Sequence, residues 1–171
     1  MRIEIQNSGP GDMYEIFELY RLATALQKER GCVPWPDFET ALIKNEIEQG
    51  RQWKMVVDGK IACIWATCFS DPLIWEERND DPAVYIHRIA TNPVFRGNKL
   101  VTGIVNWAKQ YAKQNDKAYI RIDTVGRNQR LIDHYTACGF SYLGLFNLRN
   151  TNGLPAHYQN AAVSLFEIRL S

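Results

Sequence analysis

Residues 85–101 read YIHRIATNPVFRGNKLV and pass from a strand pattern through a turn into a helical pattern. The apolar positions of the first six residues indicate a strand, and Asn92 and Pro93 indicate a turn. Backbone N–H groups at the start of a helix have no partner, and the helix dipole is positive there. An anion such as a pyrophosphate can bind at such a turn, with Arg96 and Lys99 adding charge. The alternative is an ordinary strand-to-helix loop with solvated cations.

The chain on either side of this stretch alternates between the two periodicities. Asp58 and Gly59 separate two apolar runs, which is a strong signal of a β-hairpin. Residues 71–82 are expected to form a polar, acidic loop that carries Trp75. Helices packed on a mixed sheet are expected, in an α/β (α+β) fold. We expect strands near residues 2–5, 53–57, 60–69, 83–90, 119–124, 140–148 and 163–170, and helices near 13–31, 36–49, 99–115 and 129–138.

Length and composition favour one soluble domain over residues 1–171. The formal charge of +1 gives no overall field that would recruit nucleic acid or a membrane, so neither is an expected partner. Apolar stretches such as residues 61–69 are shorter than the roughly 20 residues of a membrane span. The amino-terminal residues lack the pattern of a secretory signal, which suggests a cytoplasmic location. The four cysteines form no CxxC pair, so we expect free thiols and no metal site.

Residues 96–101 resemble the coenzyme-binding motif of the GNAT superfamily of acetyl-CoA-dependent N-acetyltransferases. That motif reads Arg/Gln-x-x-Gly-x-Gly/Ala and lies between a strand and a helix. Arg96 and Gly97 fit the family, whereas Lys99 and Val101 stand where glycine and glycine or alanine are expected. Glycine allows the backbone to approach a phosphate closely, so these two departures bear on coenzyme affinity. Lys99 can offset part of the loss by its charge, and Asn98 tolerates unusual backbone angles.

A second region resembles the same family independently. Asn128 follows a predicted strand, Tyr135 lies on the next predicted helix, and Gly139-Phe140 ends it, at the family's intervals. The resemblance covers roughly residues 83–148. It implies a mixed, mostly antiparallel central sheet of six to seven strands flanked by about four helices.

The resemblance also implies a co-substrate, acetyl-CoA, and roles for individual residues. Tyr135 is the candidate general acid, because a phenol of pKa about 10 stays protonated at neutral pH and can protonate the leaving thiolate. A buried helical stripe is the structural alternative for Tyr135. Main-chain groups of Ile89 and Thr91 are expected to pair with the pantetheine arm, and an N–H near Ile89 to stabilise the oxyanion. The residues expected to bind the coenzyme are Ile89, Ala90, Thr91, Arg96, Gly97, Asn98, Lys99, Leu100, Val101, Thr102 and Asn128, of which Asn128 is also expected to cap its helix.

An amine acceptor of pKa about 10.4 must lose a proton before it attacks, so a base is expected. His87 is the first candidate, and strict alternation places it on one face of its strand with Tyr85 and Ile89. A hydrogen-bonded structural histidine is the alternative. Asp123 is a second candidate base, and a pairing with Arg121 or Arg88 is the alternative for it.

The acceptor is an unidentified amine, and its pocket is expected near Trp35 and residues 153–158. Core packing explains these aromatic residues equally well. The rival functions are a non-catalytic GNAT-like module that binds acetyl-CoA or a protein partner, and a transferase of another acyl group. The family resemblance allows a homodimer without requiring one.

Overall fold

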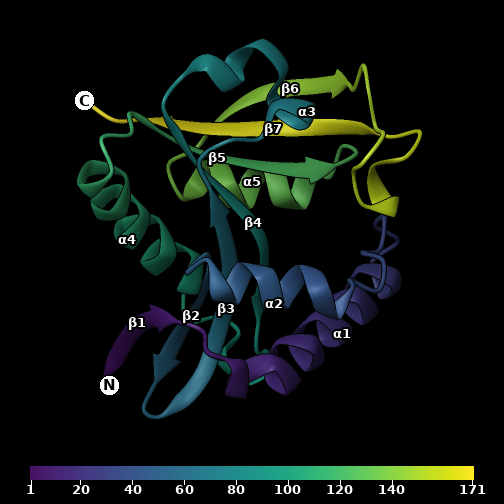
Figure 1. The fold of residues 1–171 in the computed structure, drawn as a ribbon. Helices are drawn as coiled ribbons and strands as arrows, with labels where there is room; N and C mark the ends of the chain where they lie inside the picture. The colour runs from purple at the N-terminus through teal and green to yellow at the C-terminus, as the bar shows by residue number, and fades with distance from the viewer. The chain divides into compact units, whose positions relative to one another are not determined.

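The computed structural model describes all residues, 1–171 (Figure 1). The chain forms two compact units. The first unit contains Met1–Thr67 and His87–Leu100, and the second contains Cys68–Ile86 and Val101–Ser171. The third strand, the fourth strand and the fourth helix each have residues in both units.

Seven strands pair in the order β1-β2-β3-β4-β5-β7-β6, which is the mixed, mostly antiparallel sheet that the sequence predicts. The pairing of β4 with β5 is parallel. The pairings of β1 with β2, β2 with β3, β5 with β7 and β6 with β7 are antiparallel. The strands are β1 (Ile3–Asn7), β2 (Gln52–Val57), β3 (Lys60–Cys68), β4 (Ala83–Thr91), β5 (Tyr119–Val125), β6 (Ser141–Asn147) and β7 (Ala162–Arg169).

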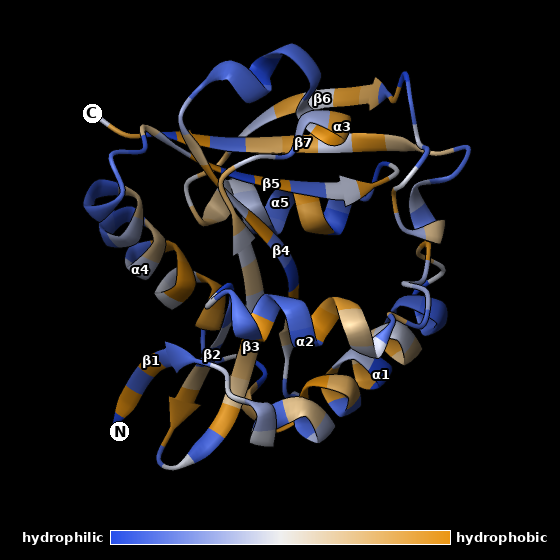
Figure 2. Cartoon of the chain, in the orientation of Figure 1, coloured by the Kyte–Doolittle hydropathy of each residue, from blue (hydrophilic) through white to orange (hydrophobic).

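The first unit packs two helices, α1 (Met13–Glu29) and α2 (Thr40–Glu48), against its strands. The turn between β2 and β3 consists of Asp58 and Gly59, both with positive φ (48° and 82°), which confirms the predicted hairpin. Apolar and polar residues are interspersed along α1, as Figure 2 shows by colour, and Ile16, Leu19 and Tyr20 of this helix are buried in the core. This core consists of Ile16, Leu19, Tyr20, Ile43, Ile61, Ile64 and Ala90.

The second helix begins at Thr40 and not at Pro36, so the predicted start was wrong by one helical turn. The residues just before the helix instead place two aromatic rings against α1. The rings of Trp35 and Phe38 meet the ring of Tyr20 edge-on, with centroids 5.9 and 5.4 Å away. Aromatic pairs of this kind add to the area that they bury, so tertiary packing outweighs the helical preference of this short segment.

The second unit contains β5, β6, β7, the shorter helix α5 (Gln129–Ala137) and all of the long helix α4 (Leu100–Gln114) except Leu100. Residues 71–82 are not the polar loop that the sequence suggested. They form a short helix, α3 (Pro72–Trp75), and a 3-10 helix, η2 (Glu76–Asp80). The side chains of Ile74 and Trp75 are almost fully buried in the core of this unit. With α3 added, the structure has the four expected α-helices and one short further one.

A buried arginine explains why this acidic segment folds. Arg121 on β5 is 1% exposed and donates hydrogen bonds to Asp81 (2.7 Å), to Glu167 (2.8 Å) and to the carbonyl oxygen of Arg78 (2.6 Å). Its guanidinium carbon lies 4.7 Å from the ring centroid of Trp75. The segment thus supplies both the charge and the aromatic face that a buried guanidinium needs.

None of the helices combines the length and the apolar composition that a membrane span requires.

Candidate active site

The loop that precedes α4 presents four exposed residues, Arg96 to Lys99. Gly97 has a φ of 84° and Lys99 a φ of 53°, so both adopt the left-handed conformation. Glycine adopts this conformation freely, whereas for lysine it costs about 1–2 kcal/mol. Lys99, which departs from the family motif, therefore has the left-handed backbone conformation that glycine adopts freely. Val101, the second departure, is 8% exposed and lies in the first turn of α4.

Asn92 fixes the start of this loop to β3. Its backbone N–H donates to the carbonyl oxygen of Ala62 (2.8 Å), and its side-chain N–H donates to that of Ile61 (3.1 Å). Its side-chain oxygen accepts a hydrogen bond from the N–H of Val94 (3.1 Å) and so caps the 3-10 helix η3 (Pro93–Phe95). The turn predicted at Asn92 and Pro93 is confirmed, and hydrogen bonds of the Asn92 side chain and backbone position it.

The strand before the loop contains an irregularity that the sequence did not suggest. Arg88 has a φ of 51°, which interrupts the pleat of β4. The alternation rule that placed His87 and Ile89 on one face therefore does not hold across Arg88. Beyond it, Ala90 is 1% exposed, and the hydroxyl oxygen of Thr91 lies 3.7 Å from the sulfur of Cys63. The first unit thus contains His87, the strand residues 89–91 and the loop as far as Leu100.

The second unit contains the other group of predicted residues, on and next to α5. Asn128 caps this helix as predicted, since its side-chain oxygen accepts a hydrogen bond from the N–H of Leu131 (3.3 Å). Tyr135 is 8% exposed, and its ring contacts those of Phe140 and Phe166 edge-on, at centroid distances of 5.9 and 5.2 Å. These two contacts restrict the direction in which the Tyr135 ring can lie.

Asp123, the second candidate base, lies near the end of β5. The hydroxyl of Tyr158 donates to its carboxylate (2.6 Å), while Arg121 and Arg88 pair with other carboxylates, so the predicted alternative pairings were wrong. One carboxylate oxygen of Asp71 lies within 4.8 Å of one of Asp123. Burial raises the pKa of Asp123 to about 6, against the opposing effect of the Tyr158 hydrogen bond. Burial and the charge of Asp123 raise the pKa of Asp71 to about 8.

These two carboxyl groups therefore influence each other's ionisation. Two nearby carboxylates repel each other, so the second one holds its proton to a higher pH. Burial raises the pKa of both groups above the usual range of a carboxyl group, and the charge of Asp123 raises the pKa of Asp71 further. Asp71 was not singled out from the sequence, where it appears as one acidic residue among several on a polar segment.

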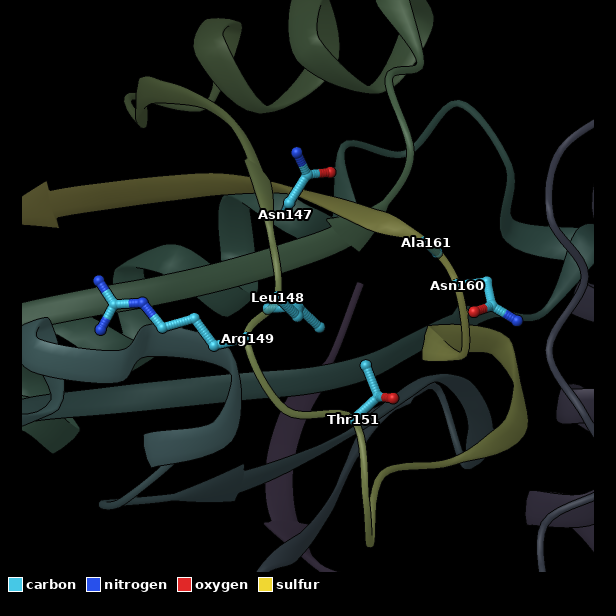
Figure 3. Close-up of a pocket in the computed structure, with 6 residues that line it drawn as sticks. All are labelled: Asn147, Leu148, Arg149, Thr151, Asn160 and Ala161. Carbon is cyan, nitrogen blue, oxygen red and sulfur yellow. The ribbon is translucent and has the colours of Figure 1, made fainter.

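The two segments predicted to form the acceptor pocket lie in different units, Trp35 in the first and residues 153–158 in the second. The side chain of Gln159 holds the second segment, donating to the carbonyl oxygens of Thr151 (2.8 Å) and Leu154 (3.3 Å). A pocket of about 360 Å³ lies beside it, between the end of β6 and the start of β7 (Figure 3). It is lined by Asn147, Leu148, Arg149, Thr151, Asn160 and Ala161.

The sequence profile described as the acetyltransferase (GNAT) family matches residues 13–140, and this range includes the loop before α4 and Tyr135. The chain belongs to this family. The GNAT family uses acetyl-CoA as its co-substrate.

Individual relatives agree with this assignment. The uncharacterized N-acetyltransferase YesJ of Bacillus subtilis is 26% identical over 106 residues, which cover 60% of this chain and 59% of YesJ. The match thus spans less than two thirds of that relative's length. A GNAT-family acetyltransferase of Listeria monocytogenes has the same fold, with a TM-score of 0.76, 23% identity and coverage of 98% of this chain and 95% of that one.

A further solved structure with this fold contains the coenzyme. YncA of Salmonella typhimurium, a putative acetyltransferase with its cofactor acetyl-CoA, has a TM-score of 0.68 at 13% identity, covering 99% of this GNAT chain and 94% of YncA.

Proposed function

We propose that this GNAT chain transfers the acetyl group of acetyl-CoA to a primary amine by direct attack in a ternary complex. The observation that carries the proposal is the loop before α4, in which Gly97 and Lys99 are both left-handed and Arg96 and Lys99 are exposed. Exposed cations and unpaired backbone N–H groups at a helix start suit the pyrophosphate of a coenzyme. The residues present fit the ligand that the family uses.

The proposed reaction needs one proton acceptor and one proton donor. The amine gives a proton to a base, its nitrogen attacks the thioester carbon, and the carbon–sulfur bond breaks as coenzyme A leaves. Tyr135 donates its phenolic proton to the sulfur in this proposal. The positions of Ile89 and Thr91 on β4 suit backbone pairing with the pantetheine amides, and Asn128 supports the turn ahead of Tyr135.

The base is proposed to be His87 or Asp123. The support for Asp123 is its pKa, which burial raises to about 6, because a base is most effective when its pKa lies close to the working pH. His87 is supported by its position on β4, next to the coenzyme-binding residues. Comparing His87→Gln with Asp123→Asn distinguishes them, because only the base variant loses the ascending limb of the pH–rate profile near neutral pH.

Titration of acetyl-CoA into the purified protein by calorimetry tests the coenzyme part of the proposal. One-to-one binding in the micromolar range is expected. Absence of heat above dilution at millimolar coenzyme would refute it, and a protein partner would then be sought. Binding without acetylation of any member of a broad amine panel would favour the non-catalytic module, and competition among acetyl-, succinyl- and longer acyl-CoAs tests the acyl preference.

Tyr135→Phe tests the general acid. The ring contacts with Phe140 and Phe166 do not need the hydroxyl, so folding and coenzyme affinity should stay nearly unchanged. Turnover at saturating substrates should fall by one or more orders of magnitude, in line with the usual effect of removing a general acid. Unchanged turnover would remove Tyr135 from the mechanism. The acceptor amine, a homodimer and the cytoplasmic location stay predictions.

A further inference from the structure

The left-handed residue in the middle of β4 is an arginine, which is an unusual choice. A bulky residue with positive φ is energetically unfavourable, and such strain persists where surrounding contacts hold it. Arg88 has a φ of 51°. It directly precedes Ile89, Ala90 and Thr91, the strand residues that the proposed function assigns to the coenzyme.

The side chain of Arg88 is clamped inside the first unit. One terminal nitrogen donates to both carboxylate oxygens of Glu46 on α2, and Nε donates to the hydroxyl oxygen of Tyr20 on α1 (3.3 Å). The guanidinium carbon lies 5.2 Å from the ring centroid of Phe38. The side chains of Arg88 and Glu46 are only 12% and 5% exposed, so water weakens this charged pair little.

A second layer of contacts holds the clamp itself. The side-chain N–H of Gln52, a fully buried residue of β2, donates to the hydroxyl of Tyr20 (3.0 Å) and to the carboxylate of Glu46 (3.3 Å). Burial alone would lower the pKa of Arg88, but Tyr20 and Glu46 raise it, so the guanidinium stays charged. Arg88 therefore bonds directly to α1 and α2, and both of its partners bond to Gln52 of β2.

The segment that follows Arg88 is fixed at its other end as well. Asn92 is hydrogen-bonded to Ala62 and Ile61 of β3 (2.8 and 3.1 Å). The three residues between Arg88 and Asn92 thus lie between two anchored positions. The backbone torsions at Arg88 set the direction of the peptide groups that follow it, because each peptide unit is planar.

We propose that Arg88 is a positioning residue whose side chain, held by Glu46 and Tyr20, maintains the left-handed turn in β4 and thereby orients the peptide groups of residues 89–91 for the coenzyme. The inference rests on the proposed function in one respect only, namely that these peptide groups meet acetyl-CoA. The clamp and its effect on the backbone are separate from it.

Two variants that differ by one methyl group test this role. Removing Arg88 alone would leave the buried charge of Glu46 with only its longer ion pair to Arg51 (3.9 Å), so both variants are made together with Glu46→Gln. Alanine at position 88 retains the cost of positive φ, whereas glycine does not, although both lack the guanidinium. We expect Arg88→Gly/Glu46→Gln to bind acetyl-CoA about tenfold more tightly than Arg88→Ala/Glu46→Gln, because the strained conformation is populated less in the alanine variant.

A matched pair at Lys60 controls for the flexibility of glycine. Lys60 is an exposed residue of β3 without positive φ, so Lys60→Gly should bind no better than Lys60→Ala. Equal affinities of the two Arg88 variants, within twofold, would overturn the proposal. A larger affinity gain from glycine at Lys60 than at Arg88 would overturn it too.

Amide hydrogen exchange without coenzyme gives a second readout, which does not depend on the proposed function. In Glu46→Gln the amides of residues 89–91 should exchange at least about tenfold faster than in the wild-type protein, because the clamp has lost its charge. Unchanged exchange at these amides would overturn the proposal, even if the Arg88 variants failed to fold. If the wild-type protein does not bind acetyl-CoA but these amides still exchange faster in Glu46→Gln, the proposed function is refuted. The inference about the clamp then stands.

Discussion

Replacing Asp71 by asparagine should stabilise the protein at alkaline pH and have little effect at acidic pH. Asp71 lies close to the carboxylate of Asp123, and burial together with that charge raises its pKa to about 8. An unfolded chain would give it a pKa of about 3.9. Asparagine has nearly the same shape and carries no charge at any pH in this range.

The sign of the effect follows from the protons bound in each state. Between pH 4 and pH 8 the folded protein retains a proton on Asp71 that the unfolded chain has released. The free energy of unfolding therefore falls as pH rises through this window, and the loss is complete above the folded pKa. At about 1.4 kcal/mol per pKa unit, the rise from 3.8 to about 8 gives an upper limit of about 6 kcal/mol. Relaxation and water entry reduce such penalties, so we expect about 2–3 kcal/mol.

Urea unfolding at pH 5, 7 and 9 measures this directly, with Asp37→Asn, a change at an exposed aspartate, as the control. The wild-type protein and the control should lose stability over this range, and Asp71→Asn should lose about 2–3 kcal/mol less. A wild-type free energy of unfolding that stays flat or rises from pH 5 to pH 9 would refute the reasoning. The same gain from Asp71→Asn at all three pH values would also refute it, because a packing effect does not depend on protonation.

Two further predictions concern stability. Lys99→Gly should raise the free energy of unfolding by about 0.5–1 kcal/mol over Lys99→Ala, because glycine relieves the positive φ (53°) at the loop before α4; equal urea midpoints of the two variants would contradict this. Arg121→Met should lower the free energy of unfolding by about 3 kcal/mol, because Glu167 and Asp81 lose their partner. The exposure of Asp81, 45%, limits this loss. A loss below about 1 kcal/mol in thermal or urea unfolding would show that the cluster contributes little.

Local signals in the sequence were sufficient for most of the architecture. Asp58 and Gly59 determine a hairpin by their own backbone preferences, and Asn128 caps a helix with its own side chain, so both could be predicted. The turn at Asn92 and Pro93 ahead of α4 belongs to this class, because the side chain of Asn92 caps it locally. The seven strands followed from periodicity in the same way.

The features that sequence reasoning missed depend on partners far along the chain. Residues 71–82 fold into helical turns because Arg121, some 40 positions away, pairs with Asp81 and stacks on Trp75. The late start of α2 likewise depends on the ring of Tyr20. Neither acidic composition nor apolar periodicity contains this information. The one signal available was the pair of opposite charges of Arg121 and Glu167, which are register partners on β5 and β7. To recognise this pair, one must first know the register of the two strands.

The position of β7 between β5 and β6 has a consequence for synthesis of the chain. Residues 119–125 and 141–147 leave the ribosome before residues 162–169, yet each needs that last strand as its antiparallel partner. Until then both have an unpaired edge, the kind of surface on which nascent chains aggregate. We expect a nascent chain that ends before residue 162 to depend on chaperones, and completion of β7 to release it from them.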